Sequence, residues 1–246
     1  MKEYNFLSQA IITMDDIKKE IQFESNRFYV IKRLLDNNKI KKLKSGLYAT
    51  VNPLTTNIFA NKYEIATALY KGVYIGYHSA LEFHGFGNQV YSNVYVASNK
   101  HYSPVEIDGL EYIFLYSNYY DGIIEKEQNS TIRVTELERT LVDCIDRLEI
   151  SGGLEEVFTA LSAVNYCDEK KLLKHLEYYN KKFLYKKTGY LFSILRPKYL
   201  SEGFFEVCKN KMSMRDDDIR EHKSLTWKYV SEWKLYVPTE IINMEN

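Results

Sequence analysis

The sequence predicts an α+β protein, with an N-terminal winged helix-turn-helix domain at residues 1–55 and a larger mixed α+β domain at residues 58–246. Three observations predict this division. In the first fifty residues, apolar side chains at helical spacing precede a short hairpin pattern. Basic side chains are concentrated in the same stretch, and Asn52-Pro53 ends it. After about residue 60, strand patterns come first and mostly helical patterns follow.

The first fifty residues contain three expected helices. The first is short and is indicated by three apolar residues, Phe6, Ala10 and Ile11. Thr13 is the expected N-cap of a second helix at 14–21, because its hydroxyl can accept a hydrogen bond from a free N–H of the first turn. Ser25 is the expected N-cap of a third helix that runs to about Asn37.

The third helix is expected to bury one apolar face, made of Phe28, Ile31, Leu34 and Leu35. Asn37-Asn38 ends it, since both residues tolerate turn conformations. Two short strands at 40–43 and 47–49 then follow around a Ser45-Gly46 turn. A helix, a helix-turn-helix and a small hairpin, in this order, predict a winged helix-turn-helix domain.

The second part of the chain is expected to contain short strands and then helices. The expected strands lie at 74–76, 94–97, 112–115, 132–134 and, in the tail, 227–237. Asp108-Gly109 is the expected hairpin turn. Thr135 and Glu138 form the pattern of a capping box. The expected helices lie at 61–70, 79–83, 136–148, 154–164, 168–180 and 184–195, with Asp168 as the cap of the 168–180 helix.

Composition excludes several classes of protein. Hydrophobic residues make up 45% and charged residues 27% of the chain, which excludes wholesale disorder and fibrous repeats. No apolar run approaches the roughly 18 residues of a membrane helix, and the start lacks a signal-peptide pattern. The three cysteines, Cys144, Cys167 and Cys208, are too far apart for a Cys-x-x-Cys metal pair. We therefore expect a cytoplasmic protein with partly buried, reduced thiols.

The charge distribution indicates a nucleic-acid partner. The whole chain has 33 basic and 33 acidic side chains and no net charge. Residues 27–44, however, contain seven basic side chains and one acidic one, which is a local charge of +6. A neutral chain with one basic end is typical of a nucleic-acid-binding module joined to a second domain.

The third helix and the hairpin supply the expected DNA contacts. The helix face opposite the expected apolar one holds Asn26, Tyr29 and Arg33. Asn26 fits adenine and Arg33 fits guanine in the major groove. The flanking Arg27 and Lys32 suit phosphates. The hairpin adds three lysines that could reach the DNA backbone or a minor groove: Lys41, Lys42 and Lys44.

The expected partner is double-stranded operator DNA with inverted repeats, because one such module reads few base pairs and two copies would bind together. The alternative is a solvated basic helix and hairpin that bind no DNA. A second basic cluster, Lys181, Lys182, Lys186 and Lys187, is expected to be a solvated helix end, with nucleic-acid contact as its alternative.

Several segments resemble AbiEi-type antitoxins. The winged helix of that family is matched by Phe28-Tyr-Val-Ile-Lys-Arg-Leu-Leu and Lys42-Leu-Lys-Ser-Gly-Leu-Tyr-Ala. Its second domain is matched by Tyr77-His-Ser-Ala-Leu-Glu-Phe-His-Gly, Ile132-Arg-Val-Thr-Glu-Leu-Glu-Arg-Thr-Leu-Val-Asp-Cys and Gly152-Gly-Leu-Glu-Glu-Val. The resemblance covers nearly the whole chain and weakens after about Lys198. It implies the antitoxin of an abortive-infection, phage-defence pair that represses its own operon and counters a nucleotidyltransferase-like toxin without a stable complex.

An enzyme is not expected, and neither are catalytic residues, a metal or a cofactor. His78 and His84 bracket Glu82 but, six residues apart, do not share a face as a zinc-binding His-Glu-x-x-His pair does. Buried, hydrogen-bonded histidines are therefore expected. The run at 216–218 is expected to be a solvated acidic turn. Glu138, Arg139 and Asp143 share a helix, on which Arg139–Asp143 is an expected i, i+4 salt bridge and a nuclease-like acidic site the remote alternative.

Two other functions stay open. The first is a transcriptional regulator whose second domain senses a small ligand. The second is a DNA-targeted nuclease. A neighbouring gene for a nucleotidyltransferase would favour the antitoxin over both.

Overall fold

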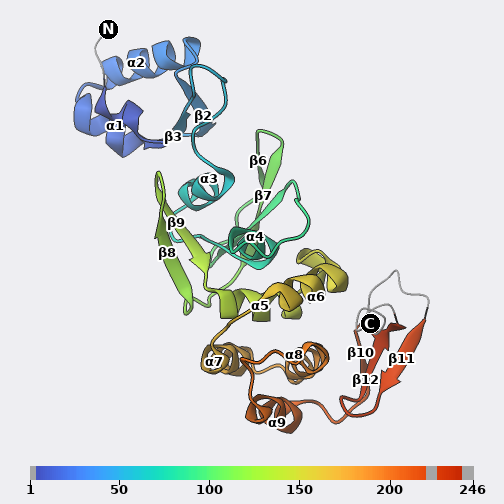
Figure 1. Cartoon of the computed structure of the whole chain (residues 1–246). Coiled ribbons are helices and arrows are strands. Elements are labelled where there is room, and N and C mark those ends of the chain that lie inside the picture. Colours follow the sequence, from blue (N-terminus) through green and yellow to red (C-terminus); the bar gives the residue numbers. More distant parts are fainter. Residues whose placement is uncertain (1–3, 220–225, 240–246) are drawn as a thin grey trace. The chain divides into compact units, whose positions relative to one another are not determined.

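The computed structural model describes residues 4–219 and 226–239 of the 246-residue chain. The chain divides into two compact units, Met1–Ile75 with Ser92–Val134, and Gly76–Tyr91 with Thr135–Asn246. Helices and strands occur in both units, which confirms the α+β class (Figure 1). The expected domain boundary at 55–58 lies inside the first unit. Independent folding of the two predicted domains stays a prediction.

The first unit begins with a small module of residues 4–51, which we call the N-terminal module (Figure 1). Its elements are η1 (Asn5–Ser8), β1 (Ile11–Thr13), α1 (Met14–Glu20), α2 (Glu24–Asp36), β2 (Ile40–Lys44) and β3 (Leu47–Thr50). The three strands form an antiparallel sheet in the order β1-β3-β2. The predicted hairpin is confirmed, and Gly46 has the positive φ of +74° that its turn requires.

The starts of the first three helices are only partly as predicted. Thr13 caps α1 as expected: its hydroxyl accepts from Asp16 N at 3.3 Å, and Thr13 N donates to the Asp16 carboxylate at 3.0 Å. The α2 helix begins earlier than expected, with Phe23 rather than Ser25 as N-cap. A first helix that includes Ile11 is wrong, because Ile11 pairs with Ala49 in the sheet. That pairing is a long-range contact without a local signal.

The apolar core of the N-terminal module corrects the predicted rotation of α2. The core consists of Phe6, Ile12, Ile17, Ile21, Val30, Leu34, Ile40 and Tyr48. Only Val30 and Leu34 of α2 are fully buried. Phe28, expected in the core, is 72% exposed, and Ile31 and Leu35 are half-buried. At 100° per residue, Phe28 lies about 140° around the helix from the Val30–Leu34 stripe.

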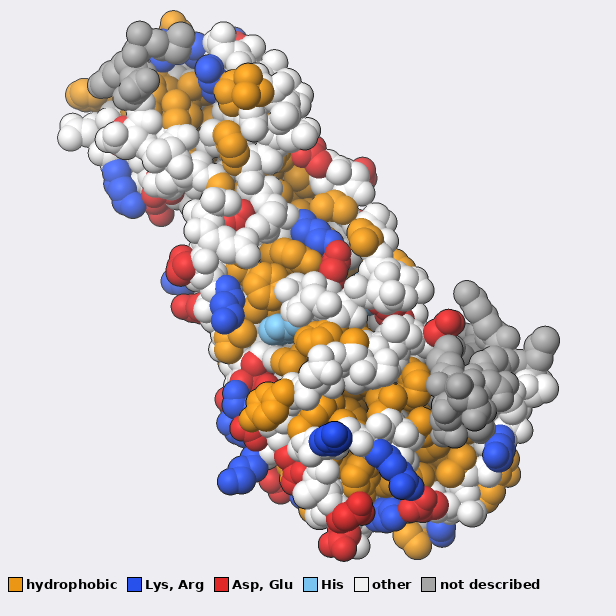
Figure 2. Space-filling view, viewed as in Figure 1, with side chains coloured by type: hydrophobic (Ala, Val, Ile, Leu, Met, Phe, Trp, Pro, Cys, Tyr) orange, Lys and Arg blue, Asp and Glu red, His pale blue; other side chains and the backbone are white. Residues whose placement is uncertain are grey.

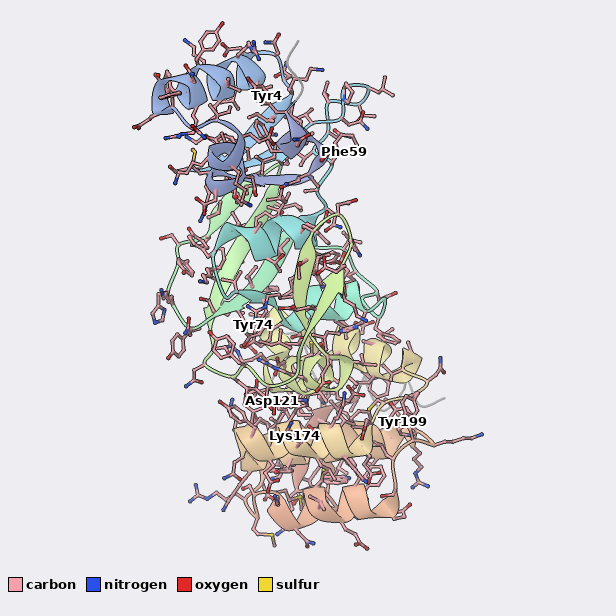
Figure 3. All side chains as sticks on the ribbon, turned by 90° about the vertical axis from the view of Figure 1, so that its left-hand side faces the viewer. Tyr4, Phe59, Tyr74, Asp121, Lys174 and Tyr199 are labelled. Atoms are coloured by element: carbon pink, nitrogen blue, oxygen red, sulfur yellow. The ribbon has the colours of Figure 1, made fainter. Side chains whose placement is uncertain are left out.

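The rest of the first unit is a six-stranded mixed sheet with one helix, α3 (Lys62–Leu69). The strand order is β6-β7-β5-β4-β9-β8. Their bounds are β4 (Tyr74–Ile75), β5 (Asn93–Ser98), β6 (Val105–Ile107), β7 (Leu110–Tyr116), β8 (Ile123–Glu127) and β9 (Thr131–Thr135). The predicted Asp108-Gly109 turn joins β6 to β7. Tyr74, labelled in Figure 3, donates to Tyr119 O at 2.7 Å and so ties β4 to a loop.

The second unit is mainly helical. Its helices are α4 (Tyr77–Phe83), α5 (Leu137–Asp146), η2 (Leu148–Ile150), α6 (Gly153–Ala163), α7 (Glu169–Tyr179), α8 (Lys182–Leu195) and α9 (Glu202–Lys211). A small sheet has the order β10-β12-β11, from β10 (Asp217–Asp218), β11 (Trp227–Val230) and β12 (Leu235–Pro238). One core joins helices and sheet, from Leu81 to Val237. Among the described residues, no helix has the length and apolar character needed to cross a membrane.

Several polar groups inside the second unit have the partners expected from the sequence. Arg139 Nε lies 3.4 Å from Asp143 Oδ2 in a buried ion pair, and Tyr179 donates to the same carboxylate. His78 is buried and lies 3.0 Å from the Glu156 carboxylate. Asp168 caps α7 as predicted, with Lys170 N at 2.9 Å from its carboxylate. The three cysteines are buried.

Three expectations for this unit are wrong. Thr135 does not cap α5, because Glu136 is the N-cap residue and has no side-chain cap bond. Lys186 and Lys187 are not solvated, because α8 carries them into the interior, and their burial also removes them as nucleic-acid contacts. Asp217 is not in a solvated turn: it lies in β10, and its carboxylate accepts from Lys186 at 2.6 Å.

Replacing Gly189 with Ala should destabilise the protein. Gly189 lies inside α8, where a Cβ would overlap the buried ring of Trp233. We expect a loss of about 1–3 kcal/mol in the free energy of unfolding, measured by urea denaturation. Gly203→Ala in α9 is the control, since its Cβ would lie 3.4 Å from the nearest atom. Equal stabilities of the two variants would contradict the close approach of α8 to Trp233.

Candidate nucleic-acid interface

The α2 helix and the β2–β3 hairpin border a groove of about 500 Å³. Its lining residues come from α1, α2 and the hairpin and are Met14, Lys18, Glu24, Arg27, Phe28, Ile31, Lys32, Leu35, Lys42 and Tyr48. Four of them are basic and one is acidic, while the others are apolar or aromatic. The groove therefore combines positive charge with an apolar lining. Figure 2 shows basic and hydrophobic side chains side by side on the surface of this module.

The predicted contact residues of α2 lie on two sides of the helix. Arg27 and Lys32 line the groove. Asn26, Tyr29 and Arg33 line a separate hollow of about 400 Å³, next to the turn between α1 and α2. Asn26 and Tyr29 are exposed, whereas Arg33 is half-buried, with its guanidinium carbon 6.0 Å from the centre of the Tyr29 ring. The predicted phosphate contacts of α2 therefore lie on the groove side of the helix, and the predicted base contacts lie on its other side.

Arg27 has a structural role in addition to its charge. Its Nη1 donates to the carbonyl oxygens of Ile21, at 3.1 Å, and Gln22, at 2.5 Å. These carbonyls belong to the turn that joins α1 to α2. The guanidinium thereby holds the angle between the two helices, and its charge lies at one end of the groove.

The three hairpin lysines have different surroundings. Lys41 forms an ion pair with Asp108. Lys44 donates to Leu69 O, and its Nζ lies 3.6 Å from the centre of the Tyr70 ring. Burial lowers the pKa of Lys44. Lys42 is exposed, and its ammonium forms no hydrogen bond or ion pair with any other residue that the structure describes, so the ammonium is available to a ligand.

Seven groove residues were not predicted as contacts, and two of them, Lys18 and Phe28, bear on binding. Lys18 adds a cation from α1; its Nζ lies 3.4 Å from Asp15 Oδ1, and both side chains are largely exposed. Phe28 was expected in the core. The signal for Lys18 is its place on α1, four residues after Met14, which also lines the groove.

Neither a protein-family model nor a curated protein sequence matches the chain. Among solved structures, the crystal structure of the RV2827C protein from Mycobacterium tuberculosis matches with a TM-score of 0.70 and 13% sequence identity. The match covers 96% of this chain and 89% of that one. The chain resembles RV2827C in fold. At this identity the likeness to RV2827C extends to the fold alone.

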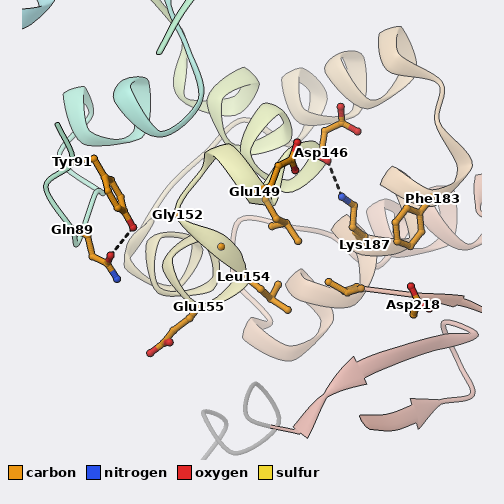
Figure 4. Close-up of a pocket in the computed structure, with 13 residues that line it drawn as sticks. Gln89, Tyr91, Asp146, Glu149, Gly152, Leu154, Glu155, Phe183, Lys187 and Asp218 are labelled. Carbon is orange, nitrogen blue, oxygen red and sulfur yellow. Dashed lines mark hydrogen bonds between the residues drawn. The ribbon is translucent and has the colours of Figure 1, made fainter. Parts of the chain in front are cut away.

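The second unit has a pocket of about 870 Å³ beside α6 (Figure 4). Lys187 lies at its wall and donates to Asp146 O at 3.0 Å, and burial lowers the pKa of Lys187 to about 8. Four carboxylates also line it: Asp146, Glu149, Glu155 and Asp218. Within residues 4–219 and 226–239, no group of three or more His, Cys, Asp or Glu side chains could hold a metal ion. The pocket therefore combines one lysine with four carboxylates.

Replacing Arg27 with Ala should destabilise the N-terminal module. The change removes two hydrogen bonds from a charged donor and leaves the turn carbonyls without them. We expect the free energy of unfolding to fall by about 1.5–3 kcal/mol, measured by urea denaturation. Lys32→Ala is the control on the same helix and should stay within about 0.5 kcal/mol of the parent, because Lys32 is exposed. A stable Arg27→Ala variant would show that the turn does not depend on the guanidinium.

Proposed function

We propose that the N-terminal module is a winged helix-turn-helix that binds double-stranded DNA. The order η1-β1-α1-α2-β2-β3, with a β1-β3-β2 sheet, supports this assignment. In such domains the second helix of the helix-turn-helix enters the major groove and the first crosses the backbone. Here α2 would enter the groove, and α1 with the hairpin would contact phosphates on either side.

The observation that carries the proposal is the basic groove beside α2. Lys18, Lys32 and Lys42 are exposed and come from three different elements. Cations spread over a concave surface can contact successive phosphates and fix the register of the helix on the duplex. The six remaining predicted contacts have smaller parts in the proposal. Arg27, Lys41 and Lys44 already have partners within the first unit. The others line the separate hollow on the far side of α2.

A double Lys32→Ala/Lys42→Ala variant should bind every DNA sequence more weakly. Each lost phosphate contact removes about 0.9 from the slope of log K against log salt. We therefore expect the slope to flatten by roughly 2, measured by fluorescence anisotropy on a labelled duplex between low and moderate salt.

The matched control is Lys44→Ala on the same hairpin. The Lys44 ammonium is held by Leu69 O and the Tyr70 ring, so its loss should lower stability and leave the salt slope unchanged. A flatter slope for Lys44→Ala, together with an unchanged slope for the double variant, would contradict the proposed contacts.

For the whole chain we propose the role of an abortive-infection antitoxin. The resemblance to AbiEi-type antitoxins supports it, and the division into a first unit that includes the basic N-terminal module and a second compact unit is compatible with two tasks. The DNA partner would be operator DNA with inverted repeats in its own operon, bound by two copies. The functional partner would be a nucleotidyltransferase-like toxin that forms no stable complex with it.

A ligand-sensing transcriptional regulator is the second candidate. The pocket of about 870 Å³ in the second unit favours it, because volumes of 300–1,000 Å³ are usual for small-molecule sites. The antitoxin and the regulator differ in one respect that can be measured, which is protection from an adjacent toxin.

Co-expression with the product of the adjacent gene should separate these two functions. If that product is toxic, the chain should restore growth when it is transcribed from an unrelated promoter. The Lys32→Ala/Lys42→Ala variant should restore growth equally well, because both lysines lie outside the second unit. Growth arrest with the folded parent chain would contradict the antitoxin role and favour the regulator.

A further inference from the structure

The α2 helix carries more apolar surface than its core uses. Val30 and Leu34 are buried and anchor α2 to the core of the N-terminal module. Phe28 is nevertheless 72% exposed and stands in the groove next to Lys32. Single exposed apolar side chains are common on protein surfaces, so the exposure of Phe28 is informative because of its position in a groove with four basic side chains.

The charges around Phe28 identify the kind of partner. The groove has four basic side chains and one acidic side chain, so an anionic surface complements it. A second copy of this chain would present the same cations in a two-fold interface, and like charges would oppose it. DNA combines a polyanionic backbone with base edges that an inserted helix can reach.

The chemistry of a phenyl ring restricts what it can contact on DNA. It has no hydrogen-bonding group, and thymine alone among the four bases presents a methyl group in the major groove. Apolar contact between a side chain such as Phe and this methyl distinguishes thymine from cytosine. The basic side chains of the groove would fix the position of α2 along the duplex, and the phenyl ring would distinguish one base.

We propose that Phe28 is a specificity-determining residue that packs against the 5-methyl group of a thymine in the bound DNA. This inference rests on the proposed DNA binding and adds the base that the groove side of α2 reads. It differs from the contacts expected from the sequence, because Asn26 and Arg33 line the other side of the helix.

The test uses deoxyuridine, which lacks only the methyl group of thymidine. The full-length chain first selects its preferred duplex from a random pool. Each thymine of that duplex is then replaced singly by deoxyuridine, and affinity is measured by fluorescence anisotropy. For the parent chain, we expect one sensitive thymine in each repeat. Its single replacement should weaken binding about four-fold, which is the effect of one buried methyl group.

Two variants on α2 complete the test. Phe28→Ala should bind the thymine and uracil duplexes equally well at that position and keep the salt slope of the parent. Phe23→Ala is the matched control: Phe23 is 71% exposed at the start of the same helix but lines the other hollow, so the four-fold effect should persist.

Several results would overturn the inference. Specific binding without any uracil-sensitive position, or an unchanged uracil effect in Phe28→Ala, would exclude the methyl contact while leaving DNA binding intact. Self-association of the parent chain in sedimentation that Phe28→Ala abolishes would assign the groove to a second copy. Failure of the parent chain to select or bind any duplex would instead contradict the proposed function itself, and the inference with it.

Discussion

The packing of Val30 and Leu34 into the core of the N-terminal module determines which side chains line the groove beside α2. These two side chains meet Ile12, Ile17 and Tyr48 in one cluster and thereby set the rotation of α2. Once the rotation is set, Phe28 and Lys32 face the hairpin, and Asn26, Tyr29 and Arg33 face the opposite hollow. Arg27 supports the same arrangement by bonding the turn before α2. The composition of the groove is therefore a consequence of core packing.

Contacts within the first unit divide the basic residues into two groups. Lys41, although exposed, and Lys44 bond Asp108 and Leu69, outside the N-terminal module, whereas Lys32 and Lys42 are exposed at the groove and Lys18 there pairs with Asp15 of its own helix. A partly buried ammonium that already has an acceptor gains little from a phosphate, since it would first have to give up the existing bond. The local charge of residues 27–44 thus overstates the number of cations available to DNA.

Local signals predicted most elements, and long-range contacts account for several of the failures, whereas the Ser25 and Thr135 caps are local predictions that are wrong. The Thr13 cap, the Ser45-Gly46 hairpin turn and the Asp168 cap depend on residues within a few positions of one another, and all three are confirmed. Strand β1 was missed because Ile11 is extended only by its pairing with β3. The predicted buried face of α2 differs from the observed one, because it includes Phe28 and omits Val30. Periodicity alone cannot distinguish a core-facing from a groove-facing residue when a helix is apolar over a wide arc. The burial of Lys186 and Lys187 has no local signal at all, because their partners lie in other elements.

In the proposed complex, α2 presents its groove side to DNA. Backbone and side-chain NMR of the isotopically labelled chain, titrated with a short duplex, tests it most directly. The account predicts that resonances of Lys18, Phe28, Lys32 and Lys42 shift most, while those of Asn26 and Arg33 and of the second unit shift little. Shifts concentrated in the hollow of Asn26, Tyr29 and Arg33, or in the second unit, would contradict it.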